Sequence, residues 1–313
     1  MSFDTPILFI IYNRPDLTEK IFNQIRLIKP KKLFVAADGP KQGKKGDIEK
    51  CQAARNILTQ IDWQCEVNTL FSNSNLGCKI GESKPMNWFF DNVSEGIIIE
   101  DDTLPDTSFF YFCENLLNYY RSEERVSMIS GNNFQFGIKR GSASYYFSKI
   151  THTWGWASWR RAWRSYDVQI KTFPTFRKEN KIKEIFEHEG LQKYFLQNLE
   201  GTYKNKLDTW DYQWTYAIWL QDGYCIIPNV NLIKNLGFRS DATHTKTYNE
   251  KCSNMDVGEI KEIIHPSQIR RDQDAEIHTY NLLYAPQPIA KRLKNKIKTI
   301  QQRLYEYFTD RDH

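Results

Sequence analysis

The sequence predicts an α/β protein with a mostly parallel central sheet flanked by helices. Continuous apolar runs, such as PILFIIYN and GIIIEDD, are typical of strands that are buried on both faces of a sheet. Between these runs lie segments with helical spacing of apolar residues, as at Leu17, Ile21, Ile25 and Ile28. Strands that alternate with helices favour right-handed βαβ units, and therefore parallel pairing.

The first hundred residues contain four such strands and the helices between them. We expect the strands at 6–13, 31–40, 65–72 and 96–102. We expect the helices at 14–28, 47–61 and 84–92. The glycine-bearing segment NSNLGCKIG, which precedes the last helix, predicts a turn.

After Asp106 the sequence becomes aromatic and less regular. SFFYFCENLLNYY predicts a helix, and so do the charged stretch from Phe176 to about Tyr203 and the segment that ends at Leu220. VSMISG predicts a short strand, and YCIIPNVNLIKNLGF predicts a strand and a loop. No clear linker interrupts the chain, so one continuous domain with a C-terminal appendage is the simplest organisation.

Composition excludes several classes of protein. A chain of 313 residues that is 40% hydrophobic and 14% aromatic can bury a sizeable core. The six cysteines are scattered without a CxxC pair, which disfavours a zinc site and a disulfide framework. The first residues lack the basic region of a signal peptide, and no apolar run approaches the roughly 20 residues that span a bilayer. We therefore expect a reduced, cytoplasmic protein.

The net charge of +5 is concentrated at the C-terminus. Residues 289–313 hold seven Lys/Arg and three Asp/Glu, a net of +4, which leaves +1 for the preceding 288 residues. A nucleic-acid partner is therefore not expected, because its basic footprint should lie on the folded domain. Apolar residues recur in this tail at helical spacing and predict a basic amphipathic helix. Its apolar stripe fits an anionic membrane surface, the rest of the domain or a second copy in a homodimer.

Polar side chains follow several of the predicted strands. They are Asn13 and Arg14, Asp38, Asn73 and Asn75, and Glu100 to Asp102. Because ligands of open α/β sheets bind at the carboxyl ends of the strands, these groups locate a candidate site.

In the stretch EGIIIEDDTLPD, a predicted buried strand is followed directly by three adjacent carboxylates, Glu100, Asp101 and Asp102. Such groups repel one another, so either water or a cation must solvate them. Hard oxygen ligands at a strand end suit Mg²⁺ or Mn²⁺ bound together with the phosphates of a substrate. A solvated surface turn is the alternative.

Several motifs occur in an order that resembles a known family. One strand ends in YNRP, a second in ADG, an NSNLG turn follows, the next strand ends in EDD, and a TWD segment comes about a hundred residues later. Together they resemble the GT-A-fold nucleotide-sugar glycosyltransferases, and EDD with WD most resembles the N-acetylglucosaminyltransferase I type. HTWGWASWRRAW is similar to a segment of bacterial glycosyltransferase-like proteins of surface-polysaccharide loci. The resemblance covers roughly Pro6 to Thr245.

The resemblance implies roles for five acidic residues. Asp102 matches the direct metal ligand, and Glu100 and Asp101 match acids that contact the donor sugar or ribose. Asp38 matches the acid that hydrogen-bonds the nucleotide base. Asp211 matches the general base that takes the proton of the acceptor hydroxyl, although from the residues alone a helix cap is an equal interpretation.

Further candidates rest on weaker patterns. Asn13, Arg14 and Lys79 would contact the donor nucleotide-sugar, while Arg14 and Lys79 equally fit solvated surface charges. His244 lies where a late loop of this fold closes over the diphosphate and would touch the metal, and a structural histidine is its alternative.

Tryptophans of the aromatic segments are candidates for binding the acceptor. Flat indole rings suit sugar faces, so Trp154, Trp156 and Trp210 would line the acceptor pocket. Core packing is the alternative for at least half of the tryptophans, because aromatic side chains dominate the packing of protein cores.

These observations predict an inverting, metal-dependent glycosyltransferase that transfers a hexosyl or N-acetylhexosaminyl group. Its cofactor would be Mn²⁺ or Mg²⁺, its donor a nucleotide-diphosphate sugar, with UDP favoured, and its acceptor a glycan or lipid-linked glycan. We place this activity in bacterial surface polysaccharide synthesis, in the cytoplasm and at the inner face of the membrane. The catalytic domain would cover 1–288, with a nucleotide-sugar half at about 1–106 and an acceptor half at about 107–288, followed by the helix at 289–313.

Two other functions remain open at this point. A sugar nucleotidyltransferase would favour a glycine-rich, Arg/Lys-bearing loop after the first strand, whereas YNRPDLTEK contains no glycine. A non-catalytic carbohydrate-binding protein would need only the aromatic residues.

Overall fold

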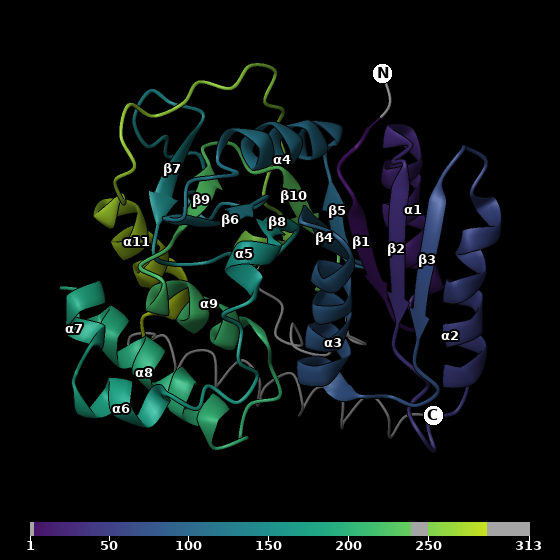
Figure 1. Ribbon diagram of the computed structural model, residues 1–313, viewed down its shortest axis with the longest axis horizontal. Helices are drawn as coiled ribbons and strands as arrows, with labels where there is room; N and C mark the ends of the chain where they lie inside the picture. Colours follow the sequence, from purple (N-terminus) through teal and green to yellow (C-terminus); the bar gives the residue numbers. More distant parts are fainter. Residues whose placement is uncertain (1–2, 239–249, 287–313) are drawn as a thin grey trace, which may run out of the picture.

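An eight-stranded sheet runs through the centre of the protein, in the order β3-β2-β1-β4-β8-β6-β9-β7 (Figure 1). The computed structural model describes residues 3–238 and 250–286, and the structural statements below concern these residues. The strands of this sheet are β1 (Ile7–Ile11), β2 (Lys32–Ala37), β3 (Glu66–Phe71), β4 (Glu95–Glu100), β6 (Val126–Ser130), β7 (Tyr145–Ser148), β8 (Trp156–Trp159) and β9 (Tyr224–Pro228). A separate antiparallel pair joins β5 (Thr103–Pro105) to β10 (Ile233–Asn235).

The sheet is mostly parallel, as the sequence predicts. β1 pairs in parallel with β2 and with β4, and β2 pairs in parallel with β3. β8 runs antiparallel to both β4 and β6, and β7 runs antiparallel to β9, which itself is parallel to β6. All residues of β1 are buried, which is why its sequence is a continuous apolar run.

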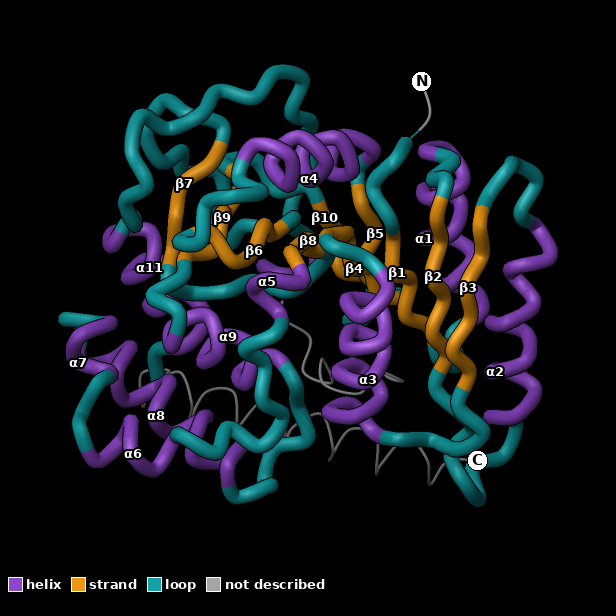
Figure 2. Tube along the Cα trace, viewed as in Figure 1, coloured by secondary structure: helices purple, strands orange, loops and turns teal. Residues whose placement is uncertain are grey.

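Helices cover both faces of the sheet (Figures 1 and 2). Alternate residues of β1 separate the two cores: Ile7 and Phe9 pack on one face with α1 and α4, and Leu8 and Ile10 pack on the other with α3, α5 and α9. The helices are α1 (Pro15–Ile28), α2 (Asp47–Arg55), α3 (Gly77–Asn92), α4 (Thr107–Tyr119), α5 (Arg160–Trp163), α6 (Phe173–Lys178), α7 (Ile182–Ile185), α8 (Glu189–Tyr203), α9 (Asp211–Leu220), α10 (Glu250–Ser253) and α11 (Gln273–Thr279), with a 3₁₀ helix at Asn56–Gln60 and a π helix at Tyr280–Tyr284.

A third core joins α6, α7 and α8 to α9. Phe186 stacks on Phe195 at a centroid distance of 5.4 Å, and Trp219 of α9 packs edge-on against Phe195 at 4.9 Å. This layer fixes α9, and with it the position of Asp211 at the first turn of that helix. Within 3–238 and 250–286, none of the helices has both the length and the apolar character needed to cross a bilayer.

The prediction of a turn through Gly77 and Gly81 is wrong, because α3 begins at Gly77 rather than at residue 84. The carboxylate of Asp208 accepts hydrogen bonds from the backbone N–H groups of Cys78 and Lys79, both at 3.0 Å, and so caps the first turn. This partner comes from 130 residues away, and no local pattern reveals it.

The predicted helix between Phe176 and Tyr203 is divided into α6, α7 and α8. Asn180 between the first two adopts a left-handed φ of 57°, which ends a helix. The sequence also gave no expectation for β5, β7 and β8, which are three or four residues long. The predicted helix at 289–313 lies outside the described residues.

Candidate active site

The three predicted carboxylates lie at the carboxyl end of β4, next to the end of β1. Arg14, in the link between β1 and α1, forms ion pairs with both Asp101 and Asp102, the second at 2.9 Å between Nη1 and Oδ2. The backbone N–H of Tyr12 donates to Asp101 Oδ2 at 3.1 Å. Two neighbouring parallel strands therefore bring Arg14 and the acidic segment together, as the strand-end argument predicts.

A fourth carboxylate, Glu82 of α3, joins this acidic cluster. Burial, together with the charges of the neighbouring carboxylates, raises the pKa of Glu82 to about 8 and that of Glu100 well above its usual range. Burial likewise raises the pKa of Asp101 to about 6, although the Arg14 guanidinium opposes the shift. The Oε2 atom of Glu82 is buried without a hydrogen-bond partner. The cluster thus holds four carboxylates against one guanidinium, and a further cation would relieve their repulsion.

These residues fit a metal ion that arrives with a substrate. Within the described part of the chain, no three His, Cys, Asp or Glu side chains converge closely enough to hold an ion by themselves. Mg²⁺ and Mn²⁺ need only one or two protein carboxylates when substrate phosphates and water complete the shell. Asp102, whose side chain is 15% exposed, is the most suitable of the predicted ligands for such an ion. His244, the other predicted ligand, lies outside the described residues.

Asp38 and Asn13 have partners within the protein. The Asp38 carboxylate accepts from the backbone N–H groups of Gly39, at 2.8 Å, and Leu76, at 3.0 Å, and from Asn75 Nδ2 at 2.8 Å. It therefore ties the end of β2 to the start of α3. Asn13 donates to the buried carboxylate of Asp47.

Lys79 lies in the first turn of α3, and its ammonium group donates to Asn205 Oδ1 at 2.8 Å. Asp38 is the most fully engaged of the three, whereas the Lys79 ammonium and the Asn13 amide each keep hydrogen-bonding capacity beyond the bond described. Of Asn13, Arg14, Asp38 and Lys79, all predicted to contact the nucleotide-sugar, Arg14 is the residue that forms ion pairs with the acidic cluster.

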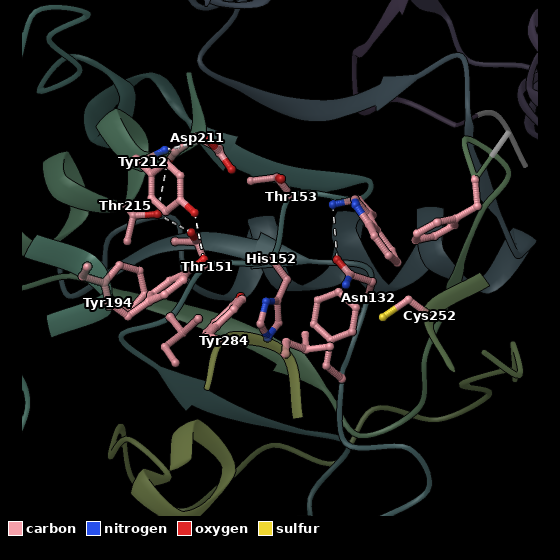
Figure 3. A pocket seen from close by; sticks show the side chains of 16 residues that line it. Asn132, Thr151, His152, Thr153, Tyr194, Asp211, Tyr212, Thr215, Cys252 and Tyr284 are labelled. Atoms are coloured by element: carbon pink, nitrogen blue, oxygen red, sulfur yellow. Dashed lines mark hydrogen bonds between the residues drawn. The ribbon is translucent and has the colours of Figure 1, made fainter. Parts of the chain in front are cut away.

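A cavity of about 510 Å³ lies between α8, α9 and the segment that joins β7 to β8 (Figure 3). Asp211 lines it, and so do Trp154, Asn132 and His152. Asp211 Oδ1 accepts from the backbone N–H of Tyr212 at 2.9 Å and from the hydroxyl of Thr209. Its Oδ2 atom makes no hydrogen bond within the described part of the chain, so this oxygen is free to accept a proton.

The acidic cluster and the cavity are neighbours. The backbone N–H of Leu236 donates to the carbonyl of Asp102 at 2.7 Å, and a Cβ on Gly237 would come within 2.3 Å of Asp102 Oδ2. The next residue, Phe238, lines the cavity. A strand-end carboxylate therefore lies against the segment that forms the cavity wall.

Cys78 provides a second link between the two groups of acids. Burial raises the pKa of its thiol, and the charges of Glu82, Glu100 and Asp211 raise it further. One side chain of α3 is thus close to both the acidic cluster and Asp211. The general-base and metal-ligand candidates share one region of the molecule.

The three candidate tryptophans differ in their placement. Trp154 lines the cavity, whereas Trp156 on β8 is fully buried and stacks on Trp210 at 5.6 Å. Trp210 is itself only 4% exposed. The acceptor role predicted for Trp156 and Trp210 therefore does not fit their placement, because Trp156 on β8 and Trp210 at the N-cap of α9 both pack in the same buried core. Trp154 precedes this strand, and Gly155 with φ of +59° separates the two indoles.

Sequence reasoning missed Glu82, Asn132 and His152. Glu82 follows the segment predicted as a turn, and a correct start for α3 would have placed it on a helix beside the strand ends. Asn132 follows β6, and His152 lies between β7 and β8. Neither position carries a local pattern that distinguishes it from an ordinary loop residue.

Comparisons with known proteins find only a weak structural likeness. No family model matches the chain, and no curated protein matches it. Among solved structures, HddC from Yersinia pseudotuberculosis is 10% identical, with a TM-score of 0.29 over 50% of this chain and 78% of that chain. The 4-diphosphocytidyl-2C-methyl-D-erythritol synthase of Anaerococcus prevotii is 9% identical, with a TM-score of 0.31 over 52% and 75%. A UDP-glucose pyrophosphorylase complexed with UDP-glucose is 7% identical, with a TM-score of 0.30 over 52% and 78%. Likeness at this level carries no argument about activity.

Proposed function

We propose that the protein is an inverting, metal-dependent glycosyltransferase that uses a nucleotide-diphosphate sugar, with UDP as the favoured nucleotide. One observation carries the proposal: an acidic cluster with a single guanidinium lies beside a cavity that contains a second, separate carboxylate. The cluster suits a divalent cation and a diphosphate, and the separate carboxylate suits a base.

The residues divide the work of such a transfer. A divalent cation at Asp102 would supply charge stabilisation for the departing diphosphate. Arg14 holds Asp101 and Asp102 in place through its two ion pairs. Asp211 takes the proton of the acceptor hydroxyl on Oδ2 while the hydroxyl oxygen attacks the sugar. The hydrogen bond from Tyr212 N–H to Oδ1 fixes the orientation of this carboxylate.

A sugar nucleotidyltransferase is the second candidate. Proteins such as the UDP-glucose pyrophosphorylase named above belong to this class of enzyme, and they too are α/β proteins. The link between β1 and α1 argues against it, because only Tyr12, Asn13 and Arg14 separate Ile11 from Pro15. Three residues without glycine leave little backbone to surround a triphosphate.

Product analysis separates the candidates. The protein is incubated with Mn²⁺ and a panel of nucleotide sugars, and release of the nucleoside diphosphate is followed with and without glycan acceptors. A parallel reaction contains nucleoside triphosphates and sugar 1-phosphates, and release of pyrophosphate is followed. Diphosphate release that Asp211→Asn abolishes supports the proposal. Pyrophosphate release without diphosphate release would replace it with the nucleotidyltransferase.

The acceptor and the cellular setting extend this proposal. A glycan or lipid-linked glycan of a bacterial surface polysaccharide would bring the enzyme to the inner face of the membrane. The basic residues of 289–313 support this, because each adds roughly 1 kcal/mol of attraction to an anionic surface.

A further inference from the structure

The cavity beside Asp211 contains two buried polar groups that lack partners. Asn132 is 0% exposed, and its Nδ2 atom makes no hydrogen bond with any described residue. His152 is 4% exposed; its ring interacts with the backbone of Thr151, but its Nδ1 atom has no partner of good hydrogen-bond geometry among the described residues. Buried polar groups are normally satisfied, because leaving one unpaired costs stability. Both side chains belong to the cavity lining, so a molecule inside the cavity could supply the missing partners (Figure 3).

The rest of Asn132 is held rigidly. Its Oδ1 atom accepts from the backbone N–H of Trp154 at 3.2 Å, while the single proton of the nearby Ser130 hydroxyl goes to the carbonyl of His152 at 2.6 Å. The amide is therefore oriented with its two N–H donors free. The His152 ring packs edge-on against Phe134 at a centroid distance of 4.7 Å.

The described residues of the lining include one acid, Asp211, and no lysine or arginine. Burial lowers the pKa of His152 to about 3, so its imidazole stays neutral near pH 7. Among the described residues, a carboxylate in this cavity would meet the carboxylate of Asp211 and find no lysine or arginine of the lining to compensate it.

The walls suit a sugar ring. Trp154 and Tyr284 present aromatic surface, and Tyr284 stacks on Tyr194 at 4.3 Å with an interplanar angle of 11°. Aromatic faces pack against the C–H surface of a saccharide, while the few polar groups read its hydroxyls. A volume of about 510 Å³ falls within the usual range for small-ligand sites.

We propose that Asn132 and His152 are specificity-determining residues that hydrogen-bond hydroxyl or amide groups of an uncharged sugar, and that the cavity rejects sugars bearing a carboxylate. This inference rests on the proposed glycosyl transfer for its biological meaning, because it names the substrate class of the same site. Asn132 donates through Nδ2, and His152 donates or accepts through Nδ1 according to its tautomer.

Direct binding to the whole protein tests the proposal without metal or nucleotide. Saturation-transfer NMR is recorded with the methyl glycosides of a hexose, an N-acetylhexosamine and a hexuronic acid, at about 1–20 mM, where weak single-sugar binding is measurable. We expect at least one uncharged glycoside to bind and the hexuronide to bind at least about tenfold more weakly. Equal binding of the hexuronide, or no binding of any glycoside, would overturn the inference.

Three variants assign the effect to the residues. Asn132→Asp keeps the oxygen that accepts from Trp154 but replaces the donors, and it should weaken binding about 10- to 100-fold. His152→Phe keeps the packing on Phe134 and removes the ring nitrogens, and it should also weaken binding. Asn118→Asp adds the same charge on the exposed surface of α4 and should leave binding unchanged. Unchanged binding in both cavity variants, or an equal loss in the α4 control, would contradict the assignment.

The outcome is separable from that of the proposed function. Saccharide binding that depends on Asn132, without any nucleoside diphosphate release, would sustain the cavity assignment and reject the transferase. Diphosphate release from a protein whose cavity binds the hexuronide equally well would sustain the transferase and reject the cavity assignment.

Discussion

Replacing Arg14 with methionine tests the electrostatic organisation of the site. The Arg14 side chain is 18% exposed, and those of its partners Asp101 and Asp102 are 3% and 15% exposed. Removing one partner of a buried ion pair typically costs about 3–5 kcal/mol, because the other charge stays buried without compensation. Each kcal/mol corresponds to about 2–4 °C of melting temperature for domains of 150–250 residues, and this longer chain belongs at the lower end, so we expect a loss of roughly 6–10 °C near pH 8.

The effect should depend on pH in a defined direction. Burial raises the pKa of Asp101 to about 6 even with Arg14 present, so the folded protein binds more protons than the unfolded chain between about pH 4 and 6. The stabilisation that Asp101 contributes is fully present below its pKa in the unfolded chain. It is lost as the pH rises through its pKa in the folded protein. Without the guanidinium the folded pKa rises further. The difference between Arg14→Met and wild type should therefore be larger at pH 8 than at pH 5.

Thermal unfolding of Arg14→Met and wild type, followed by circular dichroism at pH 5 and pH 8, measures this difference in stability. Arg26→Met is the matched control, because Arg26 pairs with Asp62 at the surface, where the two side chains are 40% and 53% exposed. Adding Asp101→Asn to Arg14→Met should restore part of the loss, since an asparagine still accepts from the backbone N–H of Tyr12. A loss no larger than that of Arg26→Met, or one independent of pH, would refute the reasoning.

Three further predictions follow from the site and the tail. Asp211→Asn keeps the acceptor for Tyr212 N–H, so nucleotide binding by calorimetry should survive while transfer falls about 10²- to 10⁴-fold; transfer at the wild-type rate would assign Asp211 a structural role. Burial raises the pKa of Glu82 to about 8, so wild-type melting temperature should fall as the pH rises from 6 to 9, and Glu82→Gln should flatten that slope; identical slopes would contradict the shift. Truncation after Pro288 should abolish sedimentation with anionic vesicles at low salt, and equal sedimentation of the truncated chain would show that the tail is not the anchor.

The N-terminal half of the fold could be predicted because its signals are local. β1, β2 and β4 are buried, mostly apolar runs. The acids that follow β4 lie at the edge of the sheet where the parallel strands end, because they come directly after the last residue of a strand. α3 could not be placed, since its start depends on Asp208, whose carboxylate reaches Cys78 from 130 residues away. With that start misplaced, Glu82 was missed as a member of the acidic cluster.

The cavity depends on long-range packing and could not be predicted. Its walls come from segments that are distant in the sequence, including Asn132, His152 and Asp211. The tryptophan-rich segment shows the same limit, because a strand places Trp156 in the core while Trp154, two residues earlier, faces the cavity. Sequence alone does not distinguish those two positions, because the start of β8 is fixed by its pairing with β4 and β6.

We propose that the acidic end of β4 binds a nucleoside diphosphate through a divalent cation. Calorimetric titration of UDP into the wild type and into Asp102→Asn, each with and without Mn²⁺, tests it most directly, with UMP as the control that lacks the second phosphate. We expect UDP to bind the wild type only with Mn²⁺ and UMP to bind much more weakly. UDP binding should disappear in Asp102→Asn, although this variant melts near the wild-type temperature. Equal UDP affinity in the two proteins, with Mn²⁺ making no difference, would contradict the account.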